Sequence, residues 1–275
     1  MNDFLKKLFG LTEKKIQKDY SNLFTNVLLG DKDAYRIISE DALNGIPKAQ
    51  SLLGNIFFGG HGDSVDYSKA AYWWKIASEN GIVEAQVSLA NCYRDGWGVE
   101  KNIVTAVELY KKAANQNDTF AMLNLASIFE KGEGAINSDP NQSFNWLMLA
   151  AENGDINAEH SLAVCYRYGI GTEVDHAKSF ALASKTAANG FAESQRLLAD
   201  CYLHGFGIEK NFVTAMDWYI KSAQQNNIEA MLTLVKLYED MSEKESSFKS
   251  NAIHWLTVGS ELGDLRCREQ LAKYS

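Results

Sequence analysis

The sequence lacks several features that assign a chain to a functional class. No apolar run approaches the roughly 20 residues that a membrane-spanning helix needs, and Lys6 and Lys7 interrupt the apolar N-terminal residues, so we expect no secretory signal. Basic residues are also scarce, because 27 Lys and Arg stand against 35 Asp and Glu, for a net charge of -8. This balance argues against a nucleic-acid partner and mildly favours a basic one.

Metal-binding and catalytic motifs are missing as well. No Cys-x-x-Cys or His-Glu-x-x-His spacing occurs, so we expect no metal and no cofactor. Neither His160 nor His204 has a Ser, Cys or carboxylate at the spacing of a recognisable catalytic triad, and we interpret both as surface histidines. These absences favour a protein that is not an enzyme.

The sequence does contain one motif that recurs at a fixed interval. Its copies start at Ala49, Ala85, Ala121, Ala158, Ser194 and Ala230, and a partial copy starts at Cys267. By subtraction, the successive spacings are 36, 36, 37, 36, 36 and 37 residues. A period of this length is the signature of a stacked array of repeats.

Each copy begins with a pattern that predicts an amphipathic helix. A Leu follows each start by four residues and an aromatic residue follows the first six starts by eight, as in Ala85, Leu89 and Tyr93. These offsets place the side chains on one helix face. Two glycines follow, as in Gly96 and Gly98, where a helix C-terminus favours a left-handed residue. Because the pair recurs without a preceding strand, a phosphate-binding loop is disfavoured.

The second half of each copy predicts a second helix with small residues at its contacts. In one copy these residues are Ala106, Leu109 and Ala113; in another they are Ala215, Trp218 and Ser222. Small residues let neighbouring helices approach, and the bulky residue between them fills the layer between helices. We therefore expect such Trp side chains to belong to the core.

The consensus of the copies is Ala-x3-Leu-Gly/Ala-x2-Tyr-x2-Gly-x-Gly-Val, followed by Ala-x2-Trp-Tyr-x-Lys-Ala-Ala. It resembles the Sel1-like repeat family, relatives of tetratricopeptide repeats with a longer corner. The period of 36–37 residues and the presence of only two prolines, Pro47 and Pro140, favour this family over 34-residue tetratricopeptide repeats, which end in proline. The resemblance covers roughly residues 31–275. It implies a right-handed superhelix that seats a partner protein on its concave side.

These patterns predict an all-α protein, a right-handed α-solenoid of stacked antiparallel helix pairs with a period of 36–37 residues. We expect capping helices over residues 1–30, a half copy and six full copies over 31–266, and a capping helix over 267–275. The apolar side chains of residues 4–11 are expected to cap the stack, with peripheral membrane attachment as the alternative. A polar segment, 241–250, replaces the glycine corner of the last full copy.

The cysteines fit a core without disulfides. Cys92, Cys165 and Cys201 each lie seven residues after a start, and Cys267 takes a start position itself. Equivalent positions of stacked helices lie about 8–10 Å apart, farther than the roughly 7 Å between Cα atoms that a disulfide allows. Free buried thiols suit a reducing compartment, so the expected location is the cytoplasm.

The candidate binding residues lie on the side of each first helix that faces away from its core. With positions 0, 4, 7, 8 and 11 of a copy in the core, positions 2, 6 and 9 point the opposite way, toward the channel that first helices line in such superhelices. The predicted partner-binding residues, which also include position 10, are Asn91, Arg94, Glu130, His160, Arg167, Tyr168, Arg196, Asp200, Leu203, His204, Lys236 and Glu239. Leucines at these positions, such as Leu123 and Leu232, indicate more than a solvated surface.

The sequence thus predicts a non-enzymatic module that binds another protein on its concave face. Arginines on this face would meet acidic or backbone groups, and its carboxylates would meet basic groups. The family resemblance implies a bacterial immunity protein that neutralises a toxin with a basic domain, or a general scaffold or signalling adaptor. An enzyme that binds or hydrolyses β-lactams is the alternative of another class, in which His204→Ala would abolish turnover.

Overall fold

A computed structural model describes residues 18–61, 64–242 and 247–274 of the chain. Among these residues, the regular elements are fifteen α-helices, α2 to α16, and one short 3-10 helix, with a single isolated bridge between Glu133 and Ile136. The predicted all-α class is confirmed. No helix in the described ranges combines the length and the apolarity that crossing a membrane requires.

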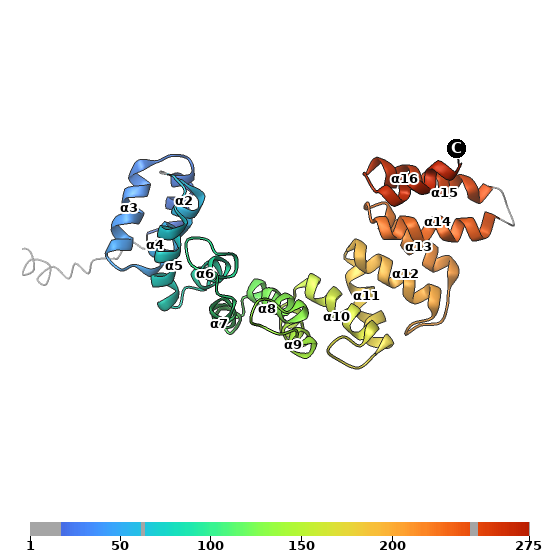
Figure 1. Ribbon diagram of the computed structural model, residues 1–275, viewed down its shortest axis with the longest axis horizontal. Coiled ribbons are helices and arrows are strands. Elements are labelled where there is room, and N and C mark those ends of the chain that lie inside the picture. Colours follow the sequence, from blue (N-terminus) through green and yellow to red (C-terminus); the bar gives the residue numbers. More distant parts are fainter. Residues whose placement is uncertain (1–17, 62–63, 243–246, 275) are drawn as a thin grey trace, which may run out of the picture. The chain divides into compact units, whose positions relative to one another are not determined.

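The chain forms two compact units, and the first is Met1–Gln116. Its described helices are α2 (Tyr20–Leu28), α3 (Lys32–Leu43), α4 (Pro47–Gly59), α5 (Tyr67–Glu79), α6 (Val83–Asp95) and α7 (Ile103–Ala114). Each helix packs against the next one in this unit, as Figure 1 shows.

The second unit is Asn117–Ser275. Its helices are α8 (Thr119–Lys131), α9 (Pro140–Glu152), α10 (Ile156–Tyr168), α11 (His176–Ala188), α12 (Ala192–His204), α13 (Phe212–Ala223), α14 (Ile228–Ser242), α15 (Ser247–Glu261) and α16 (Leu265–Leu271), followed by the 3-10 helix Ala272–Tyr274. Consecutive helices again pack side by side. Even-numbered helices from α4 to α14 are the first helices of the repeats, and the odd-numbered helices after them are the second helices.

The helices stack in pairs as an α-solenoid, and the predicted core pattern is confirmed. Ala85 and Ala121 at repeat starts are fully buried, and Leu89 and Leu125 four residues later are 3% and 0% exposed. Some first helices start at a capping side chain, such as Asp118 of α8, which accepts a hydrogen bond from the Ala121 amide. All four cysteines are buried and free, as predicted. The hand of the superhelix stays a prediction.

The second helices differ from the sequence prediction in one respect. Trp73 and Trp218, three residues after a small contact residue, are only half-buried, whereas Trp74, Tyr110 and Tyr219 one position later are 4%, 0% and 0% exposed. Helix geometry explains the difference, because residue i+4 lies about 40° around the axis from residue i and residue i+3 about 60° the other way. The +4 side chain therefore follows the small residue into the contact.

The chain ends test the predicted boundaries only in part. Residues 1–17, which include the apolar residues 4–11, lie outside the described residues, and so do residues 243–246 of the polar segment 241–250. The ends of that segment belong to α14 and α15. The division into caps and a continuous array over residues 31–266 stays a prediction.

Candidate functional site

Position 6 of the first helix is tied to the second helix in three repeats. Asn55 Oδ1 accepts a hydrogen bond from Trp74 Nε1 at 2.9 Å. In the same way, Tyr110 donates its hydroxyl proton to Asn91 Oδ1, and Tyr219 donates to Asp200 Oδ1. Asn91 and Asp200 were predicted to bind a partner, and this stays a prediction, although the oxygens named here already accept intramolecular hydrogen bonds. The buried aromatic donors of the second helix hold them.

Several other predicted binding residues are also paired within the chain. The Arg196 Nη1 atom lies 3.0 Å from Asp200 Oδ2, and the Arg94 Nε atom lies 3.1 Å from Asp95 Oδ1. Tyr274 donates its hydroxyl proton to Glu239. The helical wheel missed these pairs because it places residues on a face without showing which neighbours satisfy them.

Arg167 is the clearest correction to the predicted surface. It is only 9% exposed, and its guanidinium carbon lies 3.4 Å from the centre of the Phe206 ring. Phe206 is the middle residue of the next glycine corner, and its ring covers the arginine that was expected to reach a partner. The Nη1 atom is buried and has no hydrogen-bond partner among the residues that the structure describes. Tyr168, next in the chain, is 61% exposed as predicted.

His160 has a serine partner that the sequence spacing did not reveal. Its Nδ1 atom lies 2.8 Å from Ser194 Oγ, 34 residues along the chain, at the start of the following repeat. The interpretation of His160 as an isolated surface histidine is therefore wrong. Ser194 is fully buried, and its Oγ also lies 2.6 Å from Thr186 Oγ1. Burial lowers the pKa of His160, while the charges of Glu193 and Arg196 act in opposite directions.

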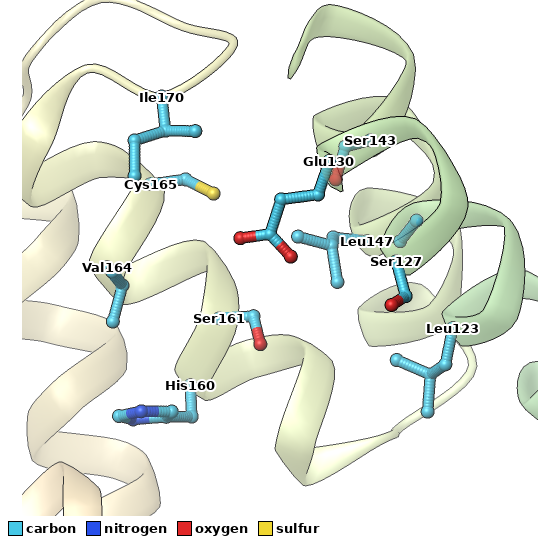
Figure 2. A pocket seen from close by; sticks show the side chains of 11 residues that line it. Leu123, Ser127, Glu130, Ser143, Leu147, His160, Ser161, Val164, Cys165 and Ile170 are labelled. Atoms are coloured by element: carbon cyan, nitrogen blue, oxygen red, sulfur yellow. The ribbon is translucent and has the colours of Figure 1, made fainter. Parts of the chain in front are cut away.

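Two first helices of the second unit enclose a pocket of about 230 Å³ together with α9. Positions 2, 6 and 9 of α8 line it, and these are Leu123, Ser127 and Glu130. Leu147 of α9 and Ser161, Val164 and Cys165 of α10 complete most of the wall. Part of the predicted strip thus lines a real cavity, between α8 and α10 (Figure 2).

Glu130 supplies the charge of this pocket. Figure 2 shows its carboxylate projecting into the space between the α8–α9 pair and α10. In the part of the chain that the structure describes, no ion pair or hydrogen bond engages this carboxylate; the backbone oxygen of Glu130 accepts from Ser138 Oγ. Burial raises the pKa of Cys165 to about 11, and the charge of Glu130 adds to the effect.

The first unit has a pocket of about 470 Å³ between α4 and α6, with different chemistry. Its walls include Phe58, Trp74 and Trp97, and the Phe58 and Trp97 ring centres lie 5.5 Å apart. Its polar groups include Asn55 and Asn91, whose side-chain oxygens already accept the hydrogen bonds described above.

A third pocket, of about 360 Å³, lies on the side of the second helices in the second unit. Met148, Ala181 and Leu182 contribute to its walls. Its carboxylates include Glu159, which is 7% exposed and whose Oε1 lies 2.6 Å from Lys185 Nζ. The charge of Glu159 is therefore already neutralised.

The remaining predicted residues do not converge on a single centre. Lys236 and His204 are exposed, and Leu203 is partly buried against the apolar core around α13 and α14. Glu130 and His160 are the predicted residues that line the α8–α10 pocket. Over residues 18–61, 64–242 and 247–274, no three His, Cys, Asp or Glu side chains lie close enough together to hold a metal ion.

Solved repeat proteins have a similar structure. c5321, a protective antigen of uropathogenic Escherichia coli strains with an SLR fold, is 29% identical with a TM-score of 0.81, over 93% of this chain and 56% of that chain. This chain thus spans little more than half of the E. coli protein. A Sel1 repeat protein from Oxalobacter formigenes is 29% identical with a TM-score of 0.77, over 88% of this chain and 98% of that one. Immunity protein Pa5087 from Pseudomonas aeruginosa is 20% identical with a TM-score of 0.41, over 78% and 81%, too low a similarity to bear on function.

The sequence comparison identifies the family. No curated protein sequence matches the chain significantly. Five consecutive segments match the family described as Sel1 repeat, at residues 47–82, 83–118, 119–155, 156–191 and 192–227. Each segment starts at the first residue of a first helix, from α4 to α12. The matches cover well over half of the sequence, and the chain therefore belongs to the Sel1 repeat family.

Proposed function

We propose that this protein binds a partner protein on its first-helix faces, which we define as the sides of the first helices that carry positions 2, 6 and 9. The observation that carries the proposal is the α8–α10 pocket, where positions 2, 6 and 9 of α8 line a cavity and present the Glu130 carboxylate, which has no ion pair among the described residues. A first-helix pocket also exists in the other unit. Pockets next to exposed polar groups are the places where partner side chains contribute most binding energy.

The proposal favours binding over catalysis for a physical reason. The Ser194 hydroxyl beside His160 is fully buried, so a substrate does not reach it without unfolding of the repeat. Burial disfavours the nucleophilic thiolate at two cysteines, because it raises the pKa of Cys92 to about 12 and of Cys201 to about 11. Free buried thiols also support the cytoplasm as the proposed compartment.

Within this class, we propose that the partner is a basic protein and that the chain neutralises a toxin. The net charge of -8 and the unpaired Glu130 carboxylate both favour a basic surface on the partner. A general scaffold or adaptor would use the same face. Affinity distinguishes the two roles, since neutralisation requires one partner held at nanomolar Kd, whereas an adaptor binds several partners more weakly.

Capture from cells of the source organism tests the proposal with a matched pair of variants. Ser127→Arg fills the α8–α10 pocket with a charge of the wrong sign, whereas Ala181→Arg places the same side chain at an exposed position of α11 on the second-helix side. We expect the partner bound by the wild type to be lost with Ser127→Arg and kept with Ala181→Arg. The opposite pattern would assign binding to the second-helix side and refute the proposal.

An activity assay addresses the enzymatic alternative. We expect no turnover of chromogenic β-lactam and ester substrates by the purified protein. Turnover that disappears in the His204→Ala variant would show catalysis on this surface and would replace the binding proposal.

A further inference from the structure

We propose that the α8–α10 pocket holds a single basic side chain, lysine or arginine, from the partner protein. This inference rests on the proposed function and specifies the chemistry of the occupant. Three observations support it: the volume of the pocket, its aliphatic walls, and the Glu130 carboxylate, which has no ion pair among the described residues.

The pocket has the dimensions and walls for one long side chain. Its volume of about 230 Å³ is below the roughly 300–1,000 Å³ of pockets that take drug-sized ligands. Leu123, Leu147 and Val164 provide an aliphatic wall from three different helices. Lysine and arginine side chains cover such surfaces with their methylene stems and keep the charged end at a polar group.

Glu130 provides that polar group at a favourable place in the helix. It lies in the last turn of α8, at the negative end of the helix dipole. A cation there is attracted both by the carboxylate and by the helix end, while a bound carboxylate would be repelled by both. Lys131 in the same turn is exposed and forms no ion pair with Glu130 in the described structure. The Ser127 and Ser161 hydroxyls on the pocket wall can accept further hydrogen bonds from an ammonium group.

Two other carboxylates of the second unit, Asp200 and Glu159, contrast with Glu130. Asp200 has Arg196 Nη1 at 3.0 Å, and Glu159 has Lys185 Nζ at 2.6 Å. Both carry an intramolecular cation, so a partner's cation would have to displace it. At Glu130 the corresponding place is open and faces a cavity of side-chain size.

Methyl NMR on the full chain provides the test, with two blocked pentapeptides as probes. One is acetyl-Ala-Ala-Lys-Ala-Ala-amide, and the other carries norleucine in place of the lysine, with a stem of nearly the same length and no charge. We expect the lysine peptide to give saturable shifts of the Leu123, Leu147 and Val164 methyl groups. We expect the norleucine peptide to bind at least tenfold more weakly, and added salt to reduce the difference.

Two variants locate the effect. Glu130→Gln removes the pocket charge and should weaken binding of the lysine peptide at least fivefold. Glu152→Gln removes the same charge from an exposed residue that lines the third pocket, and should leave binding to the α8–α10 pocket unchanged. The comparison of the two peptides on the wild type needs no variant, so it stands even if a substitution perturbs folding.

Several results would overturn the inference. These are shifts away from the three methyl groups, equal binding of the two peptides, or equal effects of Glu130→Gln and Glu152→Gln. A free amine such as n-butylamine binding ten times more tightly than the lysine peptide would indicate a small-molecule site instead of a docking site. If a captured partner is lost with Ser127→Arg but is still bound by Glu130→Gln, this inference would be wrong and the proposed function would stand. If the lysine peptide binds the pocket but Ser127→Arg releases no captured partner, this inference would stand and the proposed function would fail.

Discussion

The pockets of the two units lie at the same place in the repeat but offer different chemistry. In the first unit, aromatic side chains such as Phe58 and Trp74 line the space between α4 and α6, and the nearby amide oxygen of Asn55 is occupied by Trp74. In the second unit, Leu147 replaces the aromatic donor and Ser127 replaces the amide acceptor. The comparison teaches that two positions, one on each helix of the pair, decide whether the first-helix face is held internally or left for a partner.

Truncating the side chain at the decisive second-helix position should give the largest contrast. Tyr110→Ala removes a fully buried ring and leaves Asn91 without its donor, and we expect a loss of about 4 kcal/mol in the free energy of unfolding. Leu147→Ala should cost about 2 kcal/mol, because Leu147 already borders a cavity. Urea unfolding measures both values. An equal or larger loss for Leu147→Ala would mean that the two repeats are packed alike.

The glycine corners should behave identically in the two units. A Cβ at Gly98 would lie 2.1 Å from the Tyr67 carbonyl oxygen, and one at Gly171 would lie 2.0 Å from the Pro140 carbonyl oxygen. Since both also have positive φ, we expect each change to alanine to cost about 3 kcal/mol. Gly190 has φ of +87° with nothing within 4 Å, so Gly190→Ala, the control, should cost about 1 kcal/mol. Thermal and urea unfolding measure these losses of unfolding free energy. Unequal losses at Gly98 and Gly171 would contradict a corner geometry that is the same in the two units.

Thiol labelling should show a smaller difference, of about tenfold. Burial raises the pKa of Cys165 to about 11 and of Cys92 to about 12, so at pH 8 the reactive thiolate is about ten times more abundant at Cys165. Alkylation of the native protein followed by mass spectrometry should therefore modify Cys165, on the pocket wall of the second unit, before Cys92 in the first. Cys201 also has a pKa of about 11 but is fully buried. Its labelling rate therefore shows whether solvent access or thiolate abundance controls the reaction. Earlier labelling of Cys92 would contradict the expected order.

The smallest effect concerns the pH dependence of stability at the wall of the α8–α10 pocket. Burial lowers the pKa of His160 below its ordinary value of 6.5, so the unfolded chain binds this proton more readily than the folded one. The contribution of neutral His160 is therefore complete above pH 6.5 and is lost as the pH falls below that value. His160→Gln should flatten this part of the curve of unfolding free energy against pH. An unchanged curve would show that His160 is not the titrating group.

Sequence reasoning predicted the features that repeat and missed those that depend on the neighbouring helix. The starts, the leucines and the glycine corners recur in register, so averaging over copies reveals them, and Ala121 and Leu125 are buried as expected. The binding strip was derived from one helix at a time. For this reason it included Arg167, which Phe206 covers, and Asp200, whose Oδ1 accepts a hydrogen bond from Tyr219 of the next helix.

The amino-acid sequence alone determined the period, the all-α class and the buried face of each first helix, because 36 to 37 residues of recurring apolar pattern leave one way to bury that face. Only the tertiary structure decided which polar groups remain available to a partner. Availability depends on distances between side chains about 20 to 40 residues apart, and no helical pattern contains those distances. Glu130 and Asp200 both lie on the outward face of a first helix, yet in the described structure only Asp200 accepts a hydrogen bond from a second-helix tyrosine, Tyr219.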